Sequence, residues 1–308
     1  MTTRSGPGEG RRDPGLDPVI GERRQLINLA YRLLGSLAEA EDAVQETYAR
    51  WYAMSRQQQE AVENSGAWLT TVASRICLNL LGSARARREI YVGQWLPEPL
   101  PDPAERPGGR PGGATADPAD RITLDESVSM AFLVVLERMT PAERVAFILH
   151  DVFIYPFTEV ADITGRTPAA CRQLASSARR RVRAAQPPAT PTARQASIVR
   201  DFKKAWEARD IDALIGLLDP GASLTGDGGA ALHPIEGGEQ VACFLADLAR
   251  AAPSNVRLLE RTVNGQPGLV KQQDGVTVAV YAFEIAADQI TSIWAILNPG
   301  KLRPWATG

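Results

Sequence analysis

Few cysteines and histidines occur in this chain, which limits the chemistry that it could carry out. Its 308 residues include three cysteines, Cys77, Cys171 and Cys243, and two histidines. The cysteines lie far apart and each has apolar neighbours, so we expect buried thiols rather than a disulfide framework or a zinc site. The sequence therefore predicts no metal site.

Long apolar runs are also missing. No segment approaches the length needed to cross a bilayer, and the opening residues, MTTRSGPGEGRRDPG, have no apolar core of a signal peptide. We therefore expect a cytoplasmic protein that does not bind membranes. The net charge of −2 argues against a chain that coats nucleic acid indiscriminately, so DNA binding must come from local basic patches.

Segments rich in proline and glycine divide the chain into parts. Residues 97–118 and 186–192 cannot sustain a helix or a central strand, and residues 1–18 have a similar composition. We predict a disordered tail over 1–19, a folded part over 20–91, a linker over 92–121, a second folded part over 122–185, a linker over 186–194 and a third folded part over 195–305.

The most informative local pattern lies at residues 156–183, which predict two short helices around a tight turn. Gly165 suits a turn that needs a positive φ, Thr167 can cap the next helix, and Pro168 fits its first position. This is the outline of a DNA-reading helix-turn-helix. The alternative is an ordinary helical hairpin with a solvated basic end.

The second helix of this pair presents a polar face. Helical spacing directs Arg172, Gln173 and Ser176 outward, where arginine and glutamine can read guanine and adenine edges in the major groove. The arginines that follow are spread around the helix and suit contacts with phosphates: Arg179, Arg180, Arg181 and Arg183.

Apolar residues in the first folded part recur at helical spacing. They predict a first helix that starts near 26 and ends at the Gly35–Ser36 break, and further helices over 38–52 and 66–89. We expect Trp51, Tyr52 and Trp68 to lie in the core. This periodicity indicates a small all-α bundle.

The third folded part begins with a helix at about 196–209 that continues through 212–219. Strand-like runs follow at 222–226, 256–263, 268–273, 275–285 and 289–297, separated by glycine-containing turns. Helices followed by an antiparallel sheet predict an α+β domain. The alternation along 275–285 fits a curved sheet covered on one face.

Several motifs occur in an order that resembles a known family. Residues 42–47 (DAVQET) and the helix GAWLTTVASR resemble region 2 of bacterial sigma factors of the extracytoplasmic-function class, and the helix-turn-helix resembles their region 4. WLPEPL at 95–100, Asp-Gly-Gly at 227–229 and NPGKL at 298–302 resemble the subgroup with a C-terminal SnoaL-like domain, the ECF41 type. The resemblance implies a multidomain fold: two all-α sigma domains, the region 2 helical bundle and the region 4 helix-turn-helix, followed by an α+β SnoaL/NTF2-like cone.

The same resemblance implies an alternative sigma factor with two kinds of partner, core RNA polymerase (β′ clamp and β flap) and promoter DNA. Asp42, Gln45 and Glu46 fall on the helix that docks on the β′ clamp, although a solvated helix face is the alternative. Region 4 would read the minus-thirty-five element. Region 2 would read the minus-ten element through Arg75, Asn79, Arg85, Arg87 and Arg88.

The subgroup resemblance further implies that the C-terminal domain modulates activity. We expect Trp95, an aromatic residue shortly before prolines, to pack on a folded domain of this same chain. The Asp-Gly-Gly segment could instead be an ordinary turn. The positions expected to make the regulatory interdomain contacts are Trp95, Leu96, Pro97, Asp227, Gly228, Gly229, Asn298, Lys301 and Leu302.

Enzymes occur among SnoaL-like cones, and they use Asp and His inside the cone. Here His233 precedes Pro234 and is expected in a loop, while His150 lies outside this domain. We therefore predict no enzymatic activity and no cofactor. The alternative function is a one-component helix-turn-helix regulator with a ligand-sensing NTF2-like domain, which would usually dimerise; for a sigma factor we expect a monomer when free.

Overall fold

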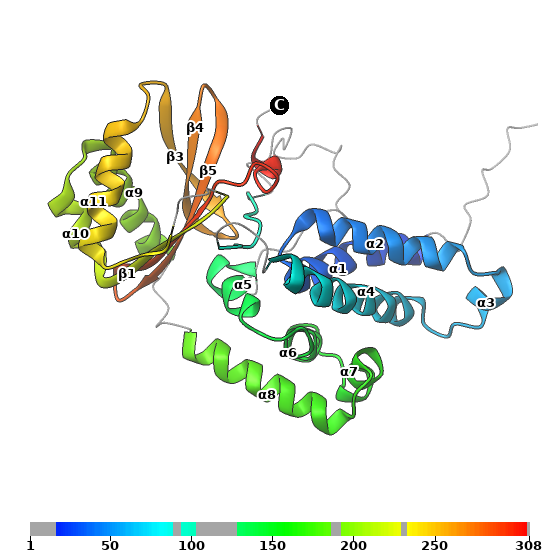
Figure 1. Ribbon diagram of the computed structural model, residues 1–308. Coiled ribbons are helices and arrows are strands. Elements are labelled where there is room, and N and C mark those ends of the chain that lie inside the picture. Colours follow the sequence, from blue (N-terminus) through cyan, green and yellow to red (C-terminus); the bar gives the residue numbers. More distant parts are fainter. Residues whose placement is uncertain (1–16, 89–93, 103–127, 186–191, 229–232, 307–308) are drawn as a thin grey trace, which may run out of the picture.

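Three folded parts follow one another along the chain (Figure 1). The computed structural model describes residues 17–88, 94–102, 128–185, 192–228 and 233–306. Most of the predicted tail and linkers lies outside these ranges. The first helix begins at Asp17 and another begins at Thr192, each a few residues inside a segment predicted to be irregular.

The first part is the predicted helical bundle. Its helices are α1 (Asp17–Leu34), α2 (Leu37–Tyr52), α3 (Arg56–Glu60) and α4 (Ser65–Arg88). The short helix α3 was not predicted; its capping box joins Ser55 and Gln58. The expected burial of Tyr52 is wrong, because Tyr52 lies on the outer side of the last turn of α2, is 55% exposed and stacks with Tyr48 at 6.3 Å between ring centroids.

The second part contains the predicted helix-turn-helix. Its elements are α5 (Met130–Glu137), α6 (Pro141–Phe147), the π-helical turn η4 (Ile148–Val152), α7 (Phe157–Thr164) and α8 (Pro168–Ala185). Gly165 ends α7 with a φ of 64°, and the Ala170 amide donates to Thr167 Oγ1 at 3.2 Å. Both features are as predicted.

These two helical parts share one hydrophobic core. Buried side chains from α1, α2 and α4 form a single cluster with those from α6, α7 and α8. Hydrogen bonds also join the two helical parts: Tyr155 Oη donates to Thr70 Oγ1 at 3.0 Å, and Arg144 Nη1 donates to the Leu33 carbonyl at 2.9 Å. In the described conformation the two parts are therefore held against each other.

The third part is an α+β domain built on one six-stranded sheet. Its elements are α9 (Thr192–Ala208), α10 (Ile211–Leu217), β1 (Leu218–Asp227), β2 (Ile235–Glu236), α11 (Gly238–Ala251), β3 (Val256–Val263), β4 (Gln266–Gln273), β5 (Val276–Ala286), β6 (Gln289–Ile296) and the 3₁₀ turn η5 (Arg303–Trp305). The strand order is β2-β1-β6-β5-β4-β3, antiparallel except that β1 and β6 run parallel. The parallel pair and α11 were not predicted.

Both faces of this sheet are covered. Helices α9, α10 and α11 pack on one face, as Figure 1 shows. The other face is covered by Leu96 and Met130 from earlier in the chain and by Leu302 and Trp305. The prediction that Cys243 is buried is wrong, because it points away from the buried stripe of α11 and is exposed.

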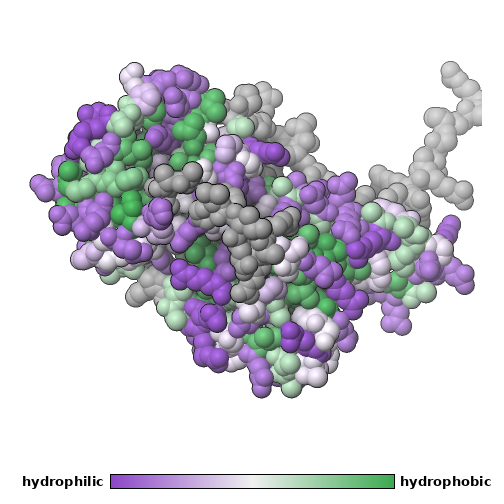
Figure 2. Space-filling view, in the orientation of Figure 1, coloured by the Kyte–Doolittle hydropathy of each residue, from purple (hydrophilic) through white to green (hydrophobic). Residues whose placement is uncertain are grey.

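The visible surface in Figure 2 is mainly hydrophilic, with hydrophobic residues in small groups. Among the described residues, no helix is long and apolar enough to cross a membrane, and no group of His, Cys, Asp and Glu side chains could hold a metal ion.

Candidate functional site

Helix α2 presents the three residues expected to bind polymerase. Asp42, Gln45 and Glu46 are all exposed, while Ala43 and Val44 between them are buried in the bundle. Glu46 also forms an ion pair with Arg50, one turn later, at 2.5 Å. The three predicted residues therefore share one accessible polar face.

Helix α4 carries the residues expected to read DNA from the first part. Arg75 and Asn79 are exposed on it. Arg75 Nη2 donates to the Asp162 carbonyl on α7 at 2.9 Å, so this guanidinium is hydrogen-bonded to the helix-turn-helix. Residues Arg85, Arg87 and Arg88 continue α4, but their side chains lie outside the described part of the structure.

Two of the three residues expected on the outward face of α8 are exposed there. Arg172 and Gln173 are exposed, and the Arg172 guanidinium lies 5.5 Å from the centre of the Phe157 ring. Ser176 is half-buried, and its Oγ accepts a hydrogen bond from Arg180 Nη1 at 3.4 Å.

The arginines at the end of α8 differ in their freedom to contact phosphates. Arg179 forms an ion pair with Asp151 at 2.6 Å and is partly buried. Arg181 lies 4.0 Å from Glu143, while its side chain is half exposed. Together with exposed Arg180 and Arg183 they form a basic end of the helix, in which Arg179 also has a structural role.

Residues 94–102, called the strap below, run from the helical bundle across the α+β domain. Here Trp95, Leu96, Asp227 and Lys301 form an interdomain cluster. Asp227 is fully buried; its Oδ2 accepts a hydrogen bond from the Leu96 amide at 3.0 Å and pairs with Lys301 Nζ. Lys301 Nζ also donates to the Leu96 carbonyl and lies 4.0 Å from the centre of the Trp95 ring. The predicted contact of Trp95 with a folded domain of this chain is present.

Close contact of two loops fixes the position of this cluster. Gly228 has a φ of 93°, and a Cβ at this position would lie 2.4 Å from the Asn298 nitrogen. The preceding backbone amide, that of Leu297, donates to the Asp227 carbonyl at 2.8 Å. Pro97 and Leu302 are buried, while Gly229 lies outside the described residues. Asp227 of the Asp-Gly-Gly segment therefore contacts the strap, and Gly228 lies against the loop that contains Asn298.

Asn264 was missed by sequence reasoning, although it joins three segments of the chain. This buried residue lies in the β3–β4 turn; its Nδ2 donates to Tyr31 Oη at 2.8 Å and to the Val128 carbonyl at 2.7 Å. Its Oδ1 accepts from the Leu100 amide at 2.9 Å. Asn-Gly is an ordinary hairpin signal, so no local pattern indicates this second role.

Glu98 anchors the strap to the first part of the chain. Its carboxylate accepts hydrogen bonds from the Leu37 amide at 2.7 Å and Ser36 Oγ at 3.2 Å, at the start of α2. Burial raises the pKa of the Glu98 carboxyl, although these hydrogen bonds favour its charged form. On the other side of the strap, Trp305 Nε1 donates to the Pro99 carbonyl at 2.8 Å.

His233 is exposed in a loop, as predicted. Within the described ranges, no His–Asp pair occurs inside the α+β domain, because the other histidine, His150, belongs to η4.

Known protein families match both helical parts of the chain, and known proteins match most of its length. Residues 20–87 match the sigma-70 region 2 family and residues 129–182 match the sigma-70 region 4 family. The chain is 36% identical over 295 residues to the ECF RNA polymerase sigma factor SigJ of Mycobacterium tuberculosis, covering 91% of this chain and 90% of SigJ. It is 34% identical over 301 residues to the probable ECF RNA polymerase sigma factor SigI of the same species, covering 94% and 96%. The crystal structure of SigJ has a TM-score of 0.74 and 33% identity, covering 95% of this chain and 100% of that one.

Proposed function

Because this chain belongs to the extracytoplasmic-function RNA polymerase sigma factors, we propose that the described conformation is its closed, less active state. As an alternative sigma factor it binds core RNA polymerase and directs it to promoters. In our proposal it is a monomer when free, acts in the cytoplasm where promoter DNA is found, catalyses no reaction, and is regulated by its own C-terminal domain.

The proposed contacts rest on the family resemblance, and the exposure and chemistry of the residues support them. Asp42, Gln45 and Glu46 form an accessible polar face for the β′ clamp. Arg172 and Gln173 are exposed on α8, where they are free to enter the major groove of the minus-thirty-five element. Region 4 also takes the β flap as its partner.

The contact between the two sigma domains is the observation that carries the proposal. Arg75, expected at the minus-ten element, donates to Asp162 of the helix-turn-helix, and both domains contribute to one core. Two promoter elements that lie apart on DNA require the two domains to separate, while the linker keeps their effective concentration high. The closed arrangement therefore has to open before both elements are read.

The C-terminal domain stabilises the closed arrangement through the strap. Asn264 bonds to Tyr31 in region 2, to Leu100 in the strap and to Val128 at the start of region 4. Buried hydrogen bonds of this kind contribute about 1 kcal/mol each. Opening exchanges these contacts for contacts with polymerase.

Lys301→Met tests this proposal. The change removes the ammonium beside the buried Asp227 carboxylate, and loss of one partner of a buried pair costs about 3–5 kcal/mol. We expect run-off transcription with core polymerase to increase relative to the wild type. Lys204→Met is the matched control, because its pair with Asp201 at 3.2 Å is exposed. Equal transcription by Lys301→Met and the wild type on every promoter fragment would contradict the regulatory proposal.

A further inference from the structure

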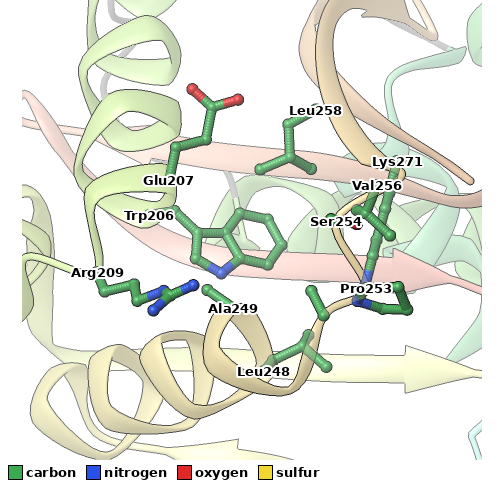
Figure 3. Close-up of a pocket in the computed structure, with 11 residues that line it drawn as sticks. Trp206, Glu207, Arg209, Leu248, Ala249, Pro253, Ser254, Val256, Leu258 and Lys271 are labelled. Atoms are coloured by element: carbon green, nitrogen blue, oxygen red, sulfur yellow. The ribbon is translucent and has the colours of Figure 1, made fainter.

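A pocket of about 220 Å³ opens in the α+β domain, on the sheet face that carries the helices (Figure 3). It lies between the last turns of α9 and α11 and strands β3 and β4. Its lining includes Trp206, Arg209, Leu248, Val256, Leu258 and Lys271. Pockets for drug-sized ligands span roughly 300–1,000 Å³, so this one suits a smaller molecule.

One wall of the pocket is rigid and apolar. Trp206 is 2% exposed, and its Nε1 already donates to the Leu245 carbonyl at 2.7 Å, so the indole offers its ring rather than a hydrogen bond. Tyr281 holds the ring in an edge contact at 5.1 Å between centroids. In Figure 3 the indole lies between Leu258 and Leu248. This wall favours the apolar body of a ligand.

Lys271 supplies a half-buried cation. It pairs across the strands with Leu258 and lies two residues from buried Leu269, on the same face of β4. Within the part of the chain that the structure describes, the Lys271 ammonium makes no hydrogen bond or ion pair. Burial lowers the pKa of Lys271, as expected for an amine that lacks a counter-charge.

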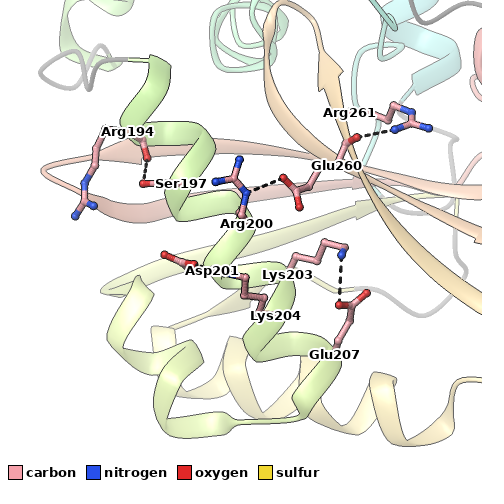
Figure 4. Close-up of polar contacts among 9 residues, drawn as sticks. All are labelled: Arg194, Ser197, Arg200, Asp201, Lys203, Lys204, Glu207, Glu260 and Arg261. Atoms are coloured by element: carbon pink, nitrogen blue, oxygen red, sulfur yellow. Dashed lines mark hydrogen bonds and ion pairs between the residues drawn. The ribbon is translucent and has the colours of Figure 1, made fainter.

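The other charges at the pocket leave a positive excess. In Figure 3 Arg209 lies on the side of the Trp206 indole opposite to Lys271. Glu207 is the one carboxylate in the described lining, and it forms an ion pair with Lys203 at 3.4 Å (Figure 4). An anionic ligand would therefore best compensate the positive charge of the pocket, whereas an amine would be repelled by the two cations Lys271 and Arg209.

We propose that this pocket binds a small amphipathic carboxylate, with its apolar body against Trp206 and its carboxylate on the Lys271 ammonium. A neutral ligand would bury this cation without compensating it. The pocket strands β3 and β4 meet at the turn that carries Asn264, so the ligand would contact the same hairpin that holds the strap.

Calorimetric titration of the full-length chain tests the proposal with phenylacetate and hexanoate as acids. Neutral 2-phenylethanol and cationic 2-phenylethylamine share the aromatic body of the first acid. We expect both acids to bind, the alcohol to bind at least 10-fold more weakly, and the amine not to bind. A charge-assisted hydrogen bond corresponds to about 10- to 100-fold in affinity, and Lys271→Met should lose that factor for phenylacetate.

Lys204→Met is again the control, because this exposed lysine on α9 is not part of the lining; it should bind phenylacetate as the wild type does. Circular dichroism checks that Lys271→Met is folded, and the comparison of acid, alcohol and amine on the wild type needs no variant. The proposal is wrong if the alcohol binds as tightly as phenylacetate, if Lys271→Met keeps its affinity, or if neither acid binds below about 10 mM. These measurements use no polymerase or promoter, so their outcome is separate from that of the transcription test.

Discussion

Replacing Asn264 by alanine should release the strap from the C-terminal domain. The substitution removes three side-chain hydrogen bonds, to Tyr31, Leu100 and Val128. The buried Leu100 amide and Val128 carbonyl lose these partners, while Tyr31 Oη still donates to the Glu98 carbonyl. At about 1 kcal/mol per bond, the free energy of opening should fall by about 3 kcal/mol. That loss corresponds to an increase on the order of 100-fold in the population of the open state.

Hydrogen exchange of the Leu96 and Glu98 amides measures this opening. Their own acceptors, Asp227 Oδ2 and the Gly35 carbonyl, are unchanged by the substitution, so faster exchange reports release of the whole strap. We expect their exchange to accelerate by the same factor of about 100.

Asp274→Ala is the matched control for backbone strain. Both Asn264 and Asp274 have a φ of 51° and precede glycine in a hairpin turn, but Asp274 is exposed and bonds only to Asn255 in the described structure. Alanine in this left-handed conformation costs the same at both positions. If the two variants accelerate exchange equally, the three buried hydrogen bonds do not hold the strap, and the reasoning is refuted.

Three further predictions concern other parts of the chain. Ile154 has a φ of 61° and is 76% exposed, so Ile154→Gly should relieve strain with little loss of burial and raise the unfolding free energy by about 0.5–1 kcal/mol in urea titrations; a lower midpoint would contradict this. Burial raises the pKa of Glu98 above its usual 4.5. The stability of the wild type relative to Glu98→Gln should therefore be highest below pH 4.5 and should fall as the pH rises through the raised pKa. If thermal unfolding shows a constant difference between the two proteins across that range, Glu98 does not titrate as inferred. Arg172→Ala should weaken binding to a matched minus-thirty-five element by about 1–3 kcal/mol and relax sequence preference, whereas Arg181→Ala should weaken binding without changing preference; equal losses for Arg172→Ala on matched and mismatched DNA would assign it to phosphate contact.

Local sequence signals predicted the elements whose formation depends on local chemistry. The turn at Gly165 and the cap at Thr167 needed only backbone and side-chain preferences, and the helix-turn-helix follows from them. The strand at 256–263 is bounded by turn residues and was predicted with the same limits that β3 has. Helix α11 was not predicted, although its stripe of Val241, Ala242 and Leu245 has helical spacing.

The contacts between parts could not be derived from local patterns. Pairing of Asn264 with Tyr31 joins residues that are far apart in sequence, and no periodicity encodes which turn meets which helix. Asp227 and Lys301 were selected because of a resemblance, while their burial as an ion pair came only from the structure. Tyr52 and Cys243 show the same limit, since an apolar neighbourhood in sequence does not decide which side of a helix faces the core.

The order of these parts along the chain has a consequence for newly made protein. Both DNA-reading domains emerge from the ribosome before Lys301 and Trp305, which complete the attachment of the strap. At about 5–20 residues per second, translation from the end of α8 to Trp305 takes roughly 6–24 s. Until then the nascent polypeptide lacks the contacts of Lys301 and Trp305, so the proposed self-inhibition is acquired only late in biosynthesis.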